Sequence, residues 1–485
     1  MTRVFIWVTI VLLWMQFITS SYAQDQALID LKPCFISGIS EKSKCATLKM
    51  PLDHRGAVSG DIDVFVAVVP ALSSQILADP LVIFSGGPGQ ANSEMGAFVA
   101  MAFKSIREHR EIILIDQRGT GNSTPLRCAD EDESVYSPAK HSQSIQSCRA
   151  SFDFAAEYFT MENVIEDTHS ILEGLGYEKV NLWGVSWGTR SAVHYLRRYP
   201  AHVRSVIVDG VLPPDIGIFE TAPKSATRAL NKLYEACKRD EICTGAYGNI
   251  EEIVDELVNK ASKGTLRYNG ANPVTGEQMS QVISLMTLVQ NIRGILYAPQ
   301  KATMLPMALY KLNNGDGRPF MALTSEGALM SKSLYMGSTL SLLCGEEVPR
   351  ITAEGAKKTG AGQLTQDTYY QYWRAACKGW PSLPGDDDIH TSLVSDVPML
   401  ILSGELDPVT PPSMGEHLAK SFKNSRHLVA GGVGHNVSYK GCIPKLLGKF
   451  LKELDASAIE AECIDKMKRP AFSVPLVSVQ KGDAK

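Results

Sequence analysis

Several kinds of segment are missing from this 485-residue sequence. It has no run of basic residues and no arginine-rich tail, and its formal net charge is −4, so nothing in it favours nucleic acid or an anionic membrane. It has no C-x-x-C and no H-E-x-x-H motif, which removes the commonest zinc patterns. We therefore expect no metal, no cofactor and no nucleic-acid partner.

Long apolar runs are absent beyond the amino terminus. There, Arg3 precedes an apolar stretch from Val4 to Ile18, and Ser21-Tyr22-Ala23 offers small residues at the two positions that a signal peptidase reads. The stretch is too short to span a bilayer comfortably, which disfavours an uncleaved anchor. We predict a signal peptide over residues 1–23 and a bacterial exported protein, periplasmic or secreted, with no stable membrane insertion after cleavage.

The ten cysteines agree with export, because an even count in an exported chain indicates disulfides. They fall into neighbouring couples along the chain. Sequence alone does not fix a pairing, so the couples are a hypothesis: 34/45, 128/148, 237/243, 344/377 and 442/463.

Short apolar runs, most of them ending in a glycine turn, indicate strands buried on both faces of a parallel sheet. Helical patterns over 163–174 and 189–199 lie between them, so we predict a mostly parallel, doubly wound α/β sheet. The expected strands are 61–69, an amino-terminal one, and then 81–84, 111–115, 179–183, 205–209 and 397–402.

The alternation of short apolar runs and helical patterns stops between about residues 213 and 393, where helical patterns such as 224–239 and 249–263 dominate. We interpret residues 213–393 as a mainly helical cap inserted between two parts of the core, 24–212 and 394–471. Residues 472–485 read as a loose tail.

The sharpest motif is Gly184-Val-Ser186-Trp-Gly188, a G-x-S-x-G between an expected strand and an expected helix. A nucleophilic serine on such a tight turn needs glycine beside it and stands at a helix amino terminus, which favours negative charge. The alternative is a plain turn with a serine helix cap.

A serine hydroxyl is a poor nucleophile without a base. In the order Ser, Asp, His, the partners are Asp407, in the turn after strand 397–402, and His435, in a glycine-rich loop. Glu405 competes for the acid role, and His417 and His427 compete for the base role. We predict Ser186, Asp407 and His435 as the catalytic triad, and the backbone amides of Trp187 and Gly87 as the oxyanion hole. For the Gly87 loop the alternative is an ordinary Gly-Pro turn.

With these residues the chain resembles the proline iminopeptidase and tripeptidyl aminopeptidase family of serine peptidases. The resemblance covers nearly the whole mature chain and implies the α/β-hydrolase fold and cleavage near a free peptide amino terminus. It rests on Gly-Gly-Pro-Gly at 86–89, Asp-Gln-Arg-Gly-Thr-Gly-Asn-Ser at 116–123, Gly-Val-Ser-Trp-Gly-Thr at 184–189, Gly-Glu-Leu-Asp-Pro-Val-Thr-Pro at 404–411 and Gly-His at 434–435.

The family also implies carboxylates in the cap that bind the substrate ammonium, and Cys-Gly-Glu-Glu at 344–347 looks like the corresponding block. We expect Glu346, with Glu347 second, in this role; the alternative is a solvated acidic pair. Asp116 and Arg118 are expected to be structural. Ser85, where many members have histidine, leaves the choice between proline and tripeptide release open.

Two other functions stay open. An esterase or lipase could use the same triad, and a non-catalytic binding protein could use the same fold.

Overall fold

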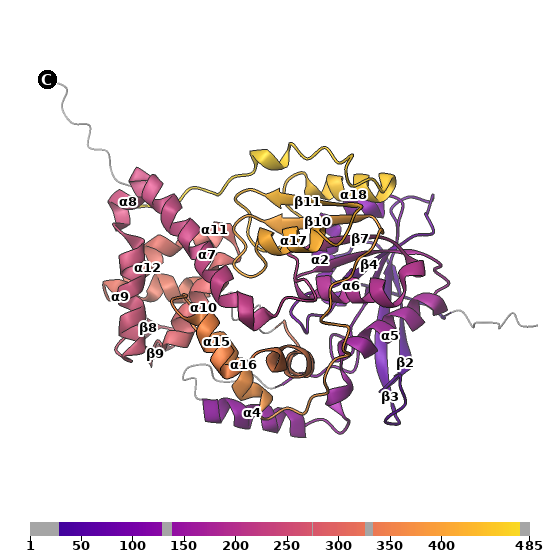
Figure 1. The fold of residues 1–485 in the computed structure, drawn as a ribbon, viewed down its shortest axis with the longest axis horizontal. Helices are drawn as coiled ribbons and strands as arrows, with labels where there is room; N and C mark the ends of the chain where they lie inside the picture. Colours follow the sequence, from indigo (N-terminus) through magenta and orange to yellow (C-terminus); the bar gives the residue numbers. More distant parts are fainter. Residues whose placement is uncertain (1–28, 129–137, 274, 325–332, 476–485) are drawn as a thin grey trace, which may run out of the picture.

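The computed structural model describes residues 29–128, 138–273, 275–324 and 333–475. Its centre is a nine-stranded sheet in the order β1-β2-β3-β5-β4-β6-β7-β10-β11 (Figure 1). The strands are β1 (Lys32–Cys34), β2 (Ser43–Pro51), β3 (Asp61–Val69), β4 (Leu81–Phe84), β5 (Ile112–Ile115), β6 (Val180–Val185), β7 (Val203–Asp209), β10 (Met399–Gly404) and β11 (Ser425–Ala430).

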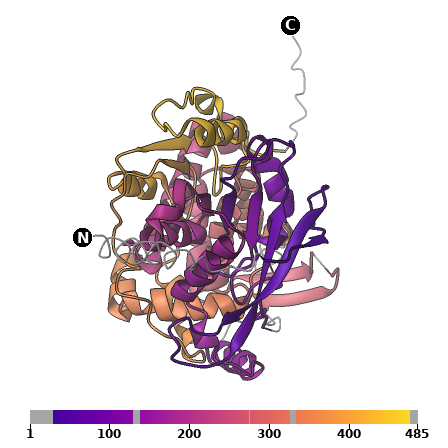
Figure 2. The ribbon, with the colours of Figure 1, turned by 90° about the vertical axis from the view of Figure 1, so that its right-hand side faces the viewer.

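The first three strands pair antiparallel and form one edge of the sheet, seen in indigo in Figure 2. The antiparallel pairing continues from β3 to β5, and from β5 to β11 all neighbours are parallel. All six strands expected from the sequence are present within about two residues at each end. The α/β-hydrolase arrangement, a large and mostly parallel sheet, is confirmed.

Helices cover both faces of the sheet. On one face α5 (Met161–Gly174), α6 (Trp187–Arg198) and α17 (Pro412–Ala419) share an apolar core with Val82 and Phe84. On the other face α2 (Gly96–Ala102), α3 (Lys104–Arg107) and α18 (Ile443–Glu453) pack with Leu81 and Ile83. Successive side chains of β4 therefore point into the two apolar cores in turn, which is why a strand buried on both faces is apolar at every position.

The expected cap region, residues 213–393, lies beside the sheet and has its own apolar core (Figure 1). It contains an exposed two-stranded hairpin, β8 (Arg267–Ala271) and β9 (Gln278–Val282), which the sequence patterns did not predict. Among its described residues, the helices include α7 (Ile218–Arg239), α8 (Glu241–Tyr247), α9 (Ile250–Ser262), α10 (Leu285–Leu296), α11 (Pro299–Ala302), α12 (Leu305–Asn313), α14 (Met336–Leu342), α15 (Ala353–Gly360) and α16 (Thr368–Cys377). Helix α4 (Pro138–Ala150) of the first core part packs against α16.

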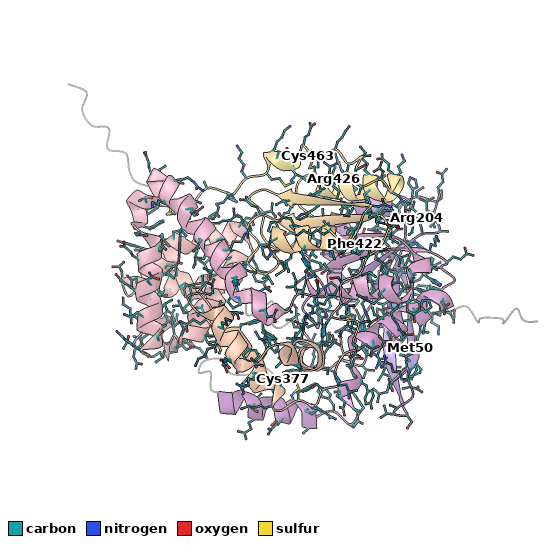
Figure 3. The ribbon with its side chains drawn as sticks, in the orientation of Figure 1. Met50, Arg204, Cys377, Phe422, Arg426 and Cys463 are labelled. Carbon is teal, nitrogen blue, oxygen red and sulfur yellow. A yellow bond between two sulfur atoms is a disulfide. The ribbon has the colours of Figure 1, made fainter. Side chains whose placement is uncertain are left out.

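All five expected disulfides are present: 34–45, 128–148, 237–243, 344–377 and 442–463. Figure 3 labels Cys377, at the end of α16, and Cys463, near the carboxy terminus. Cys344 pairs with Cys377 and so ties α16 to the π-helical turn η4 (Leu343–Glu347), which carries both expected ammonium ligands.

The prediction of a loose tail from residue 472 is wrong for its first residues. Phe472 and Val474 pack on the cap core, and the amide of Ser473 donates to the carbonyl of Thr303 at 3.1 Å. Residues 476–485 and the expected signal peptide, 1–23, lie outside the described residues. Within the described part of the chain, no helix has the length and apolar character needed to cross a membrane.

Candidate active site

Ser186 stands alone between β6 and α6 in a strained backbone conformation, φ 54° and ψ −122°. The turn is so tight that a Cβ on Gly184 would lie 2.4 Å from the carbonyl oxygen of Gly188. A Cβ on Gly188 would lie 2.0 Å from the carbonyl oxygen of Phe84. Both flanking glycines of the motif are therefore required by space, and the strain is of the kind found where a nucleophile is held at a strand end.

Asp407 and His435 are in direct contact. The Nδ1 atom of His435 lies 2.7 Å from Oδ2 of Asp407, a fully buried carboxylate. The amides of Val409 and Thr410 donate to Oδ1 at 2.8 and 2.9 Å, and the Thr410 hydroxyl donates to Oδ2 at 2.8 Å. These bonds fix the carboxylate, so Nδ1 of His435 is the donor and Nε2 is left to act as a base.

The same contact controls the charge of both groups. Burial opposes ionisation of Asp407, but the neighbouring His435 and the amides of Thr410 and Val409 outweigh it and hold the pKa of Asp407 below its ordinary value. Burial also opposes protonation of His435, yet the charge and hydrogen bond of Asp407 prevail and raise the pKa of His435. An ionised Asp407 thus stabilises the imidazolium that forms when a base takes a proton.

Asp209, at the end of β7, links the serine turn to the histidine loop. Its carbonyl accepts a hydrogen bond from the amide of Ser186 at 2.9 Å, and its buried carboxylate accepts from Ser438. A Cβ on the next residue, Gly210, would lie 3.0 Å from Cε1 of His435. The imidazole of His435 therefore packs on Gly210, and the carbonyl of the preceding residue, Asp209, binds the amide of Ser186. No functional role was predicted for Asp209 from the sequence, where the available signal was its position at a strand end followed by glycine.

The cap also contacts the histidine loop. The carbonyl of Tyr297, just after α10, accepts the amide of His435 at 3.1 Å, and the two rings meet edge to face at 5.2 Å. Gly434 has no room for a Cβ, which would lie 2.2 Å from the carbonyl oxygen of Tyr297. The buried guanidinium of Arg293 lies over the rings of Tyr297 and Tyr369. The imidazole of His435 thus packs against Gly210 after β7 on one side and against Tyr297 after α10 on the other.

The glycine loop after β4 approaches the serine closely. A Cβ on Gly86 would lie 3.1 Å from Cβ of Ser186, and Gly87 has a φ of 110°. Cap helix α14 covers this loop, because Thr339 donates its hydroxyl to the carbonyl of Pro88 at 2.7 Å. Trp187 is the first residue of α6, where an amide has no intrahelical acceptor. Both expected oxyanion donors, Gly87 and Trp187, therefore lie on segments beside Ser186.

The two expected ammonium ligands differ in their surroundings. Glu347 is fully buried and ion-paired with Arg190 and Arg350, and these charges hold its pKa below the ordinary value against the effect of burial. Glu346 is buried but accepts a single amide bond, from Met161 at 2.8 Å, and burial raises its pKa to about 8. Glu347 already has its cations, whereas Glu346 has no cation in direct contact among the described residues.

The competing residues have other partners. Glu405 pairs with Lys232 at 2.8 Å, His417 with Asp215 at 2.7 Å, and His427 with the hydroxyl of Ser403 at 2.8 Å. The expected structural roles of Asp116 and Arg118 also hold. Asp116 accepts bonds from Ser93 and Asn122, and Arg118 forms a bidentate pair with Asp167.

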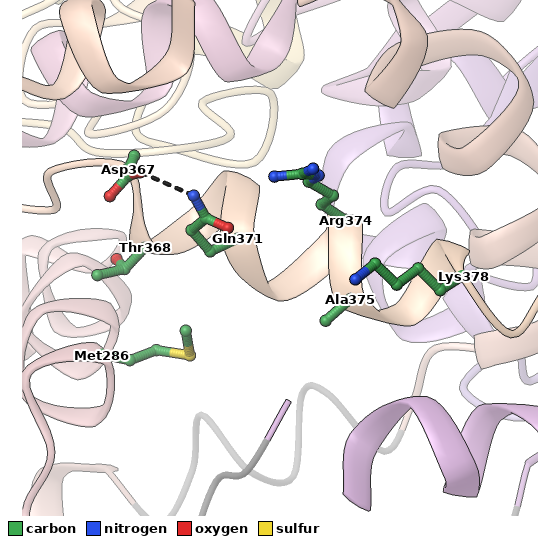
Figure 4. Close-up of a pocket in the computed structure, with 7 residues that line it drawn as sticks. All are labelled: Met286, Asp367, Thr368, Gln371, Arg374, Ala375 and Lys378. Carbon is green, nitrogen blue, oxygen red and sulfur yellow. Dashed lines mark hydrogen bonds between the residues drawn. The ribbon is translucent and has the colours of Figure 1, made fainter. Parts of the chain in front are cut away.

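A cavity of about 410 Å³ lies on the cap, along one face of α16 and against Met286 of α10 (Figure 4). Its wall carries two cations, Arg374 and Lys378, and a hydrogen-bonded pair, Gln371 and Asp367. None of the residues expected to act in catalysis lines it, so it is separate from the chemistry of the serine turn.

Two family models match the chain. The model described as alpha/beta hydrolase fold matches residues 79–236, which include Ser186, and the model described as TAP-like protein matches residues 364–463, which include Asp407 and His435. This chain has the α/β-hydrolase fold. The two matches, with the peptidase-named relatives below, serine protease Hip1 and tripeptidyl aminopeptidase, confirm the family resemblance inferred from the motifs.

Relatives of the hydrolase include serine protease Hip1 of Mycobacterium tuberculosis, 26% identical over 87% of this chain and 88% of the relative. Carboxylesterase B of the same species is 30% identical over 58% of this chain and 57% of its own. Tripeptidyl aminopeptidase of Streptomyces lividans is 25% identical over 39% of each chain. The solved proline iminopeptidase of Mycobacterium smegmatis is 16% identical, with a TM-score of 0.42, over 85% of this chain and all of that one.

Proposed function

We propose that this hydrolase is an exported serine aminopeptidase that cleaves peptides near a free amino terminus through an acyl-enzyme on Ser186. The observation that carries the proposal is the 2.7 Å contact between Asp407 and His435, in a loop that packs against the strand end holding Ser186. A relative named as a serine protease over most of both chains supports a peptide substrate.

The steps follow from the roles of the three side chains. His435 takes the proton of the Ser186 hydroxyl while Oγ of Ser186 bonds to the carbonyl carbon of the substrate. The tetrahedral oxyanion is stabilised by the amides of Gly87 and Trp187. His435 then protonates the leaving amine, the C–N bond breaks, and water, with His435 as base, releases the acyl group. Asp407 keeps the imidazole in the required tautomer throughout.

Recognition of the amino terminus is assigned to Glu346, with Glu347 second. Glu346 is the better placed of the two, because its charge is not already matched by a cation in contact. A buried carboxylate gains most from an incoming ammonium, since the pair replaces an unfavourable isolated charge. Glu347, paired with Arg190, would then hold the backbone of η4 in place.

Export is supported by the five disulfides, which persist in oxidising compartments, and by the signal-like sequence of residues 1–23.

The test is a digest of a peptide library with free and with acetylated amino termini, read by mass spectrometry. The proposal expects short amino-terminal fragments from free peptides only, and none with Ser186→Ala. The second candidate function is an esterase, favoured by the carboxylesterase relative. Rapid cleavage of blocked esters without peptide cleavage would favour it and reject the aminopeptidase.

A further inference from the structure

A second cluster of chemically competent side chains lies at the other end of the sheet. His169 and Glu173 are one turn apart on α5, and His202 ends the 3-10 turn η3 (Pro200–His202) directly before β7. One ligand atom from each residue lies within 4.8 Å of the other two. Because His202 precedes the amino end of β7, whereas Ser186 follows the carboxyl end of β6, the cluster is remote from the candidate active site.

The ring of His169 is oriented by buried neighbours. Its Nδ1 atom lies 3.3 Å from the hydroxyl of Tyr195, a fully buried residue, and its face stacks on Tyr199 at 3.5 Å between ring centroids. This leaves Nε2 directed toward Glu173, 3.5 Å from Oε1. A hydrogen-bonding partner on the second ring nitrogen is what fixes histidine ligands in metal sites. Burial also lowers the pKa of His169, which favours the neutral, ligating form.

The third group separates this cluster from an ordinary helical His–Glu pair. The ring of His202 meets that of His169 edge to face at 4.7 Å between centroids, although the two residues come from different elements. Nearby, Arg198 is paired with Glu162 and Glu166. The carboxylate of Glu173 remains turned toward the two imidazoles.

We propose that His169, Glu173 and His202 bind one divalent transition-metal ion, with Zn²⁺ the best match. Two imidazoles, one carboxylate and a water suit four-coordinate zinc, with bonds of about 2.0–2.2 Å. The ligand atoms lie up to 4.8 Å apart, so binding requires a modest contraction of the cluster. Glu173 can adjust because its side chain is 41% exposed, and His202 can adjust because it is only partly buried. The ion would clip α5 to the turn before β7 and stabilise the folded core. The ligands come from separate elements, so no contiguous sequence motif indicates the site. The site is independent of the proposed catalytic function.

The experiment titrates the full-length, chelator-treated protein with Zn²⁺ by calorimetry and records the melting temperature with and without the ion. Co²⁺ is used as a spectroscopic probe of four-coordinate geometry. The expected result is one ion per chain, a higher melting temperature, and visible Co²⁺ bands of a four-coordinate site. Glu173→Gln and His202→Ala should each weaken binding by at least about tenfold, and the same concentration of Zn²⁺ should raise their melting temperatures much less than that of the unmodified protein.

His109→Ala, at an exposed histidine outside the cluster, is the matched control and should bind Zn²⁺ like the unmodified protein. The proposal is overturned if the protein binds no Zn²⁺ at one equivalent per chain. It is also overturned if Glu173→Gln and His202→Ala bind Zn²⁺ as tightly as the unmodified protein. Covalent labelling of Ser186 does not depend on this site, so a failure here and a failure of the catalytic proposal are distinguishable.

Discussion

The buried carboxylate of Asp209 accepts two hydrogen bonds from Ser438, one from its amide at 2.7 Å and one from its hydroxyl at 2.6 Å. Ser438 follows His435 by three residues, and the carbonyl of Asp209 holds the amide of Ser186. One acid at the end of β7 thus connects the two loops that must meet for serine catalysis.

Replacing this acid should therefore disturb both activity and stability. Asp209→Asn keeps the shape but places an amide donor against the amides of Val437 and Ser438. Loss of hydrogen bonds to a buried charged group costs about 1.5–3 kcal/mol each. We expect a lower melting temperature and a kcat/KM reduced at least about tenfold, since each 1.36 kcal/mol is tenfold in rate.

Enzyme kinetics and thermal unfolding measure the two effects. Asp215→Asn, at a partly exposed acid paired with His417, is the control and should change little. Unchanged kcat/KM and melting temperature in Asp209→Asn would show that the connection between the Ser186 turn and the His435 loop through Asp209 is dispensable.

Asp407→Asn should abolish most of the activity while leaving the fold intact. The amide cannot stabilise the protonated imidazole or hold its tautomer, and the corresponding change in a serine triad lowers kcat by about 10⁴. Steady-state kinetics should show this loss, whereas Glu405→Gln should be nearly as active as the unmodified enzyme. The reverse pattern would assign the acid role to Glu405.

The pH profile follows from the raised pKa of His435. The base acts in its neutral form, so kcat/KM must fall as the pH drops through that pKa. With an uncharged ester substrate, the midpoint of the acid limb should lie above the ordinary histidine value of about 6.5. In Asp407→Asn the residual activity should show its midpoint at a lower pH, because the supporting charge is gone. A wild-type midpoint well below 6.5 would contradict the described contact.

Glu346 and Glu347 should behave differently when each is changed to glutamine. Glu346→Gln keeps the acceptor for the Met161 amide but removes the charge, so KM for free peptides should rise about tenfold or more, with blocked esters unaffected. Glu347→Gln leaves Arg190 and Arg350 unpaired and should mainly lower stability, since breaking a buried pair costs about 3–5 kcal/mol.

The pH dependence of KM provides an internal check on Glu346. Burial raises its pKa to about 8, so binding of a cationic amino terminus should tighten as the pH rises toward that value. Above it, the substrate amine itself loses its proton. Glu346→Gln should lack the tightening. Equal KM values for the two enzymes at every pH would remove Glu346 from recognition.

The sequence predicted what depends on local pattern. Strands β4 and β5 are apolar at every position and β10 at its first four, and the motif of Ser186 contains the two glycines that the turn demands. Strands β2 and β11 were not predicted, because each is partly exposed and lacks a continuous apolar run. β11 is one edge of the sheet and β2 lies next to the other edge strand, β1. Strands in such positions depend on their neighbours more than on their own composition.

The rest of the candidate site depends on contacts between distant residues. Asp209 and Ser438 are 229 residues apart, and Arg190 and Glu347 are 157 apart. Two adjacent glutamates look alike in a sequence. The positions of Arg190 on α6 and of Arg350 distinguish the paired acid from the one without a cation in contact. The packing of Tyr297 on His435 likewise follows from the placement of the cap on the core.

The most direct measurement is covalent labelling of the folded protein with a fluorophosphonate, followed by mass mapping of the modified peptide. We predict one adduct, on Ser186, that forms much more slowly in His435→Ala and is absent from Ser186→Ala. An adduct on another residue, or equal labelling without the imidazole, would contradict it.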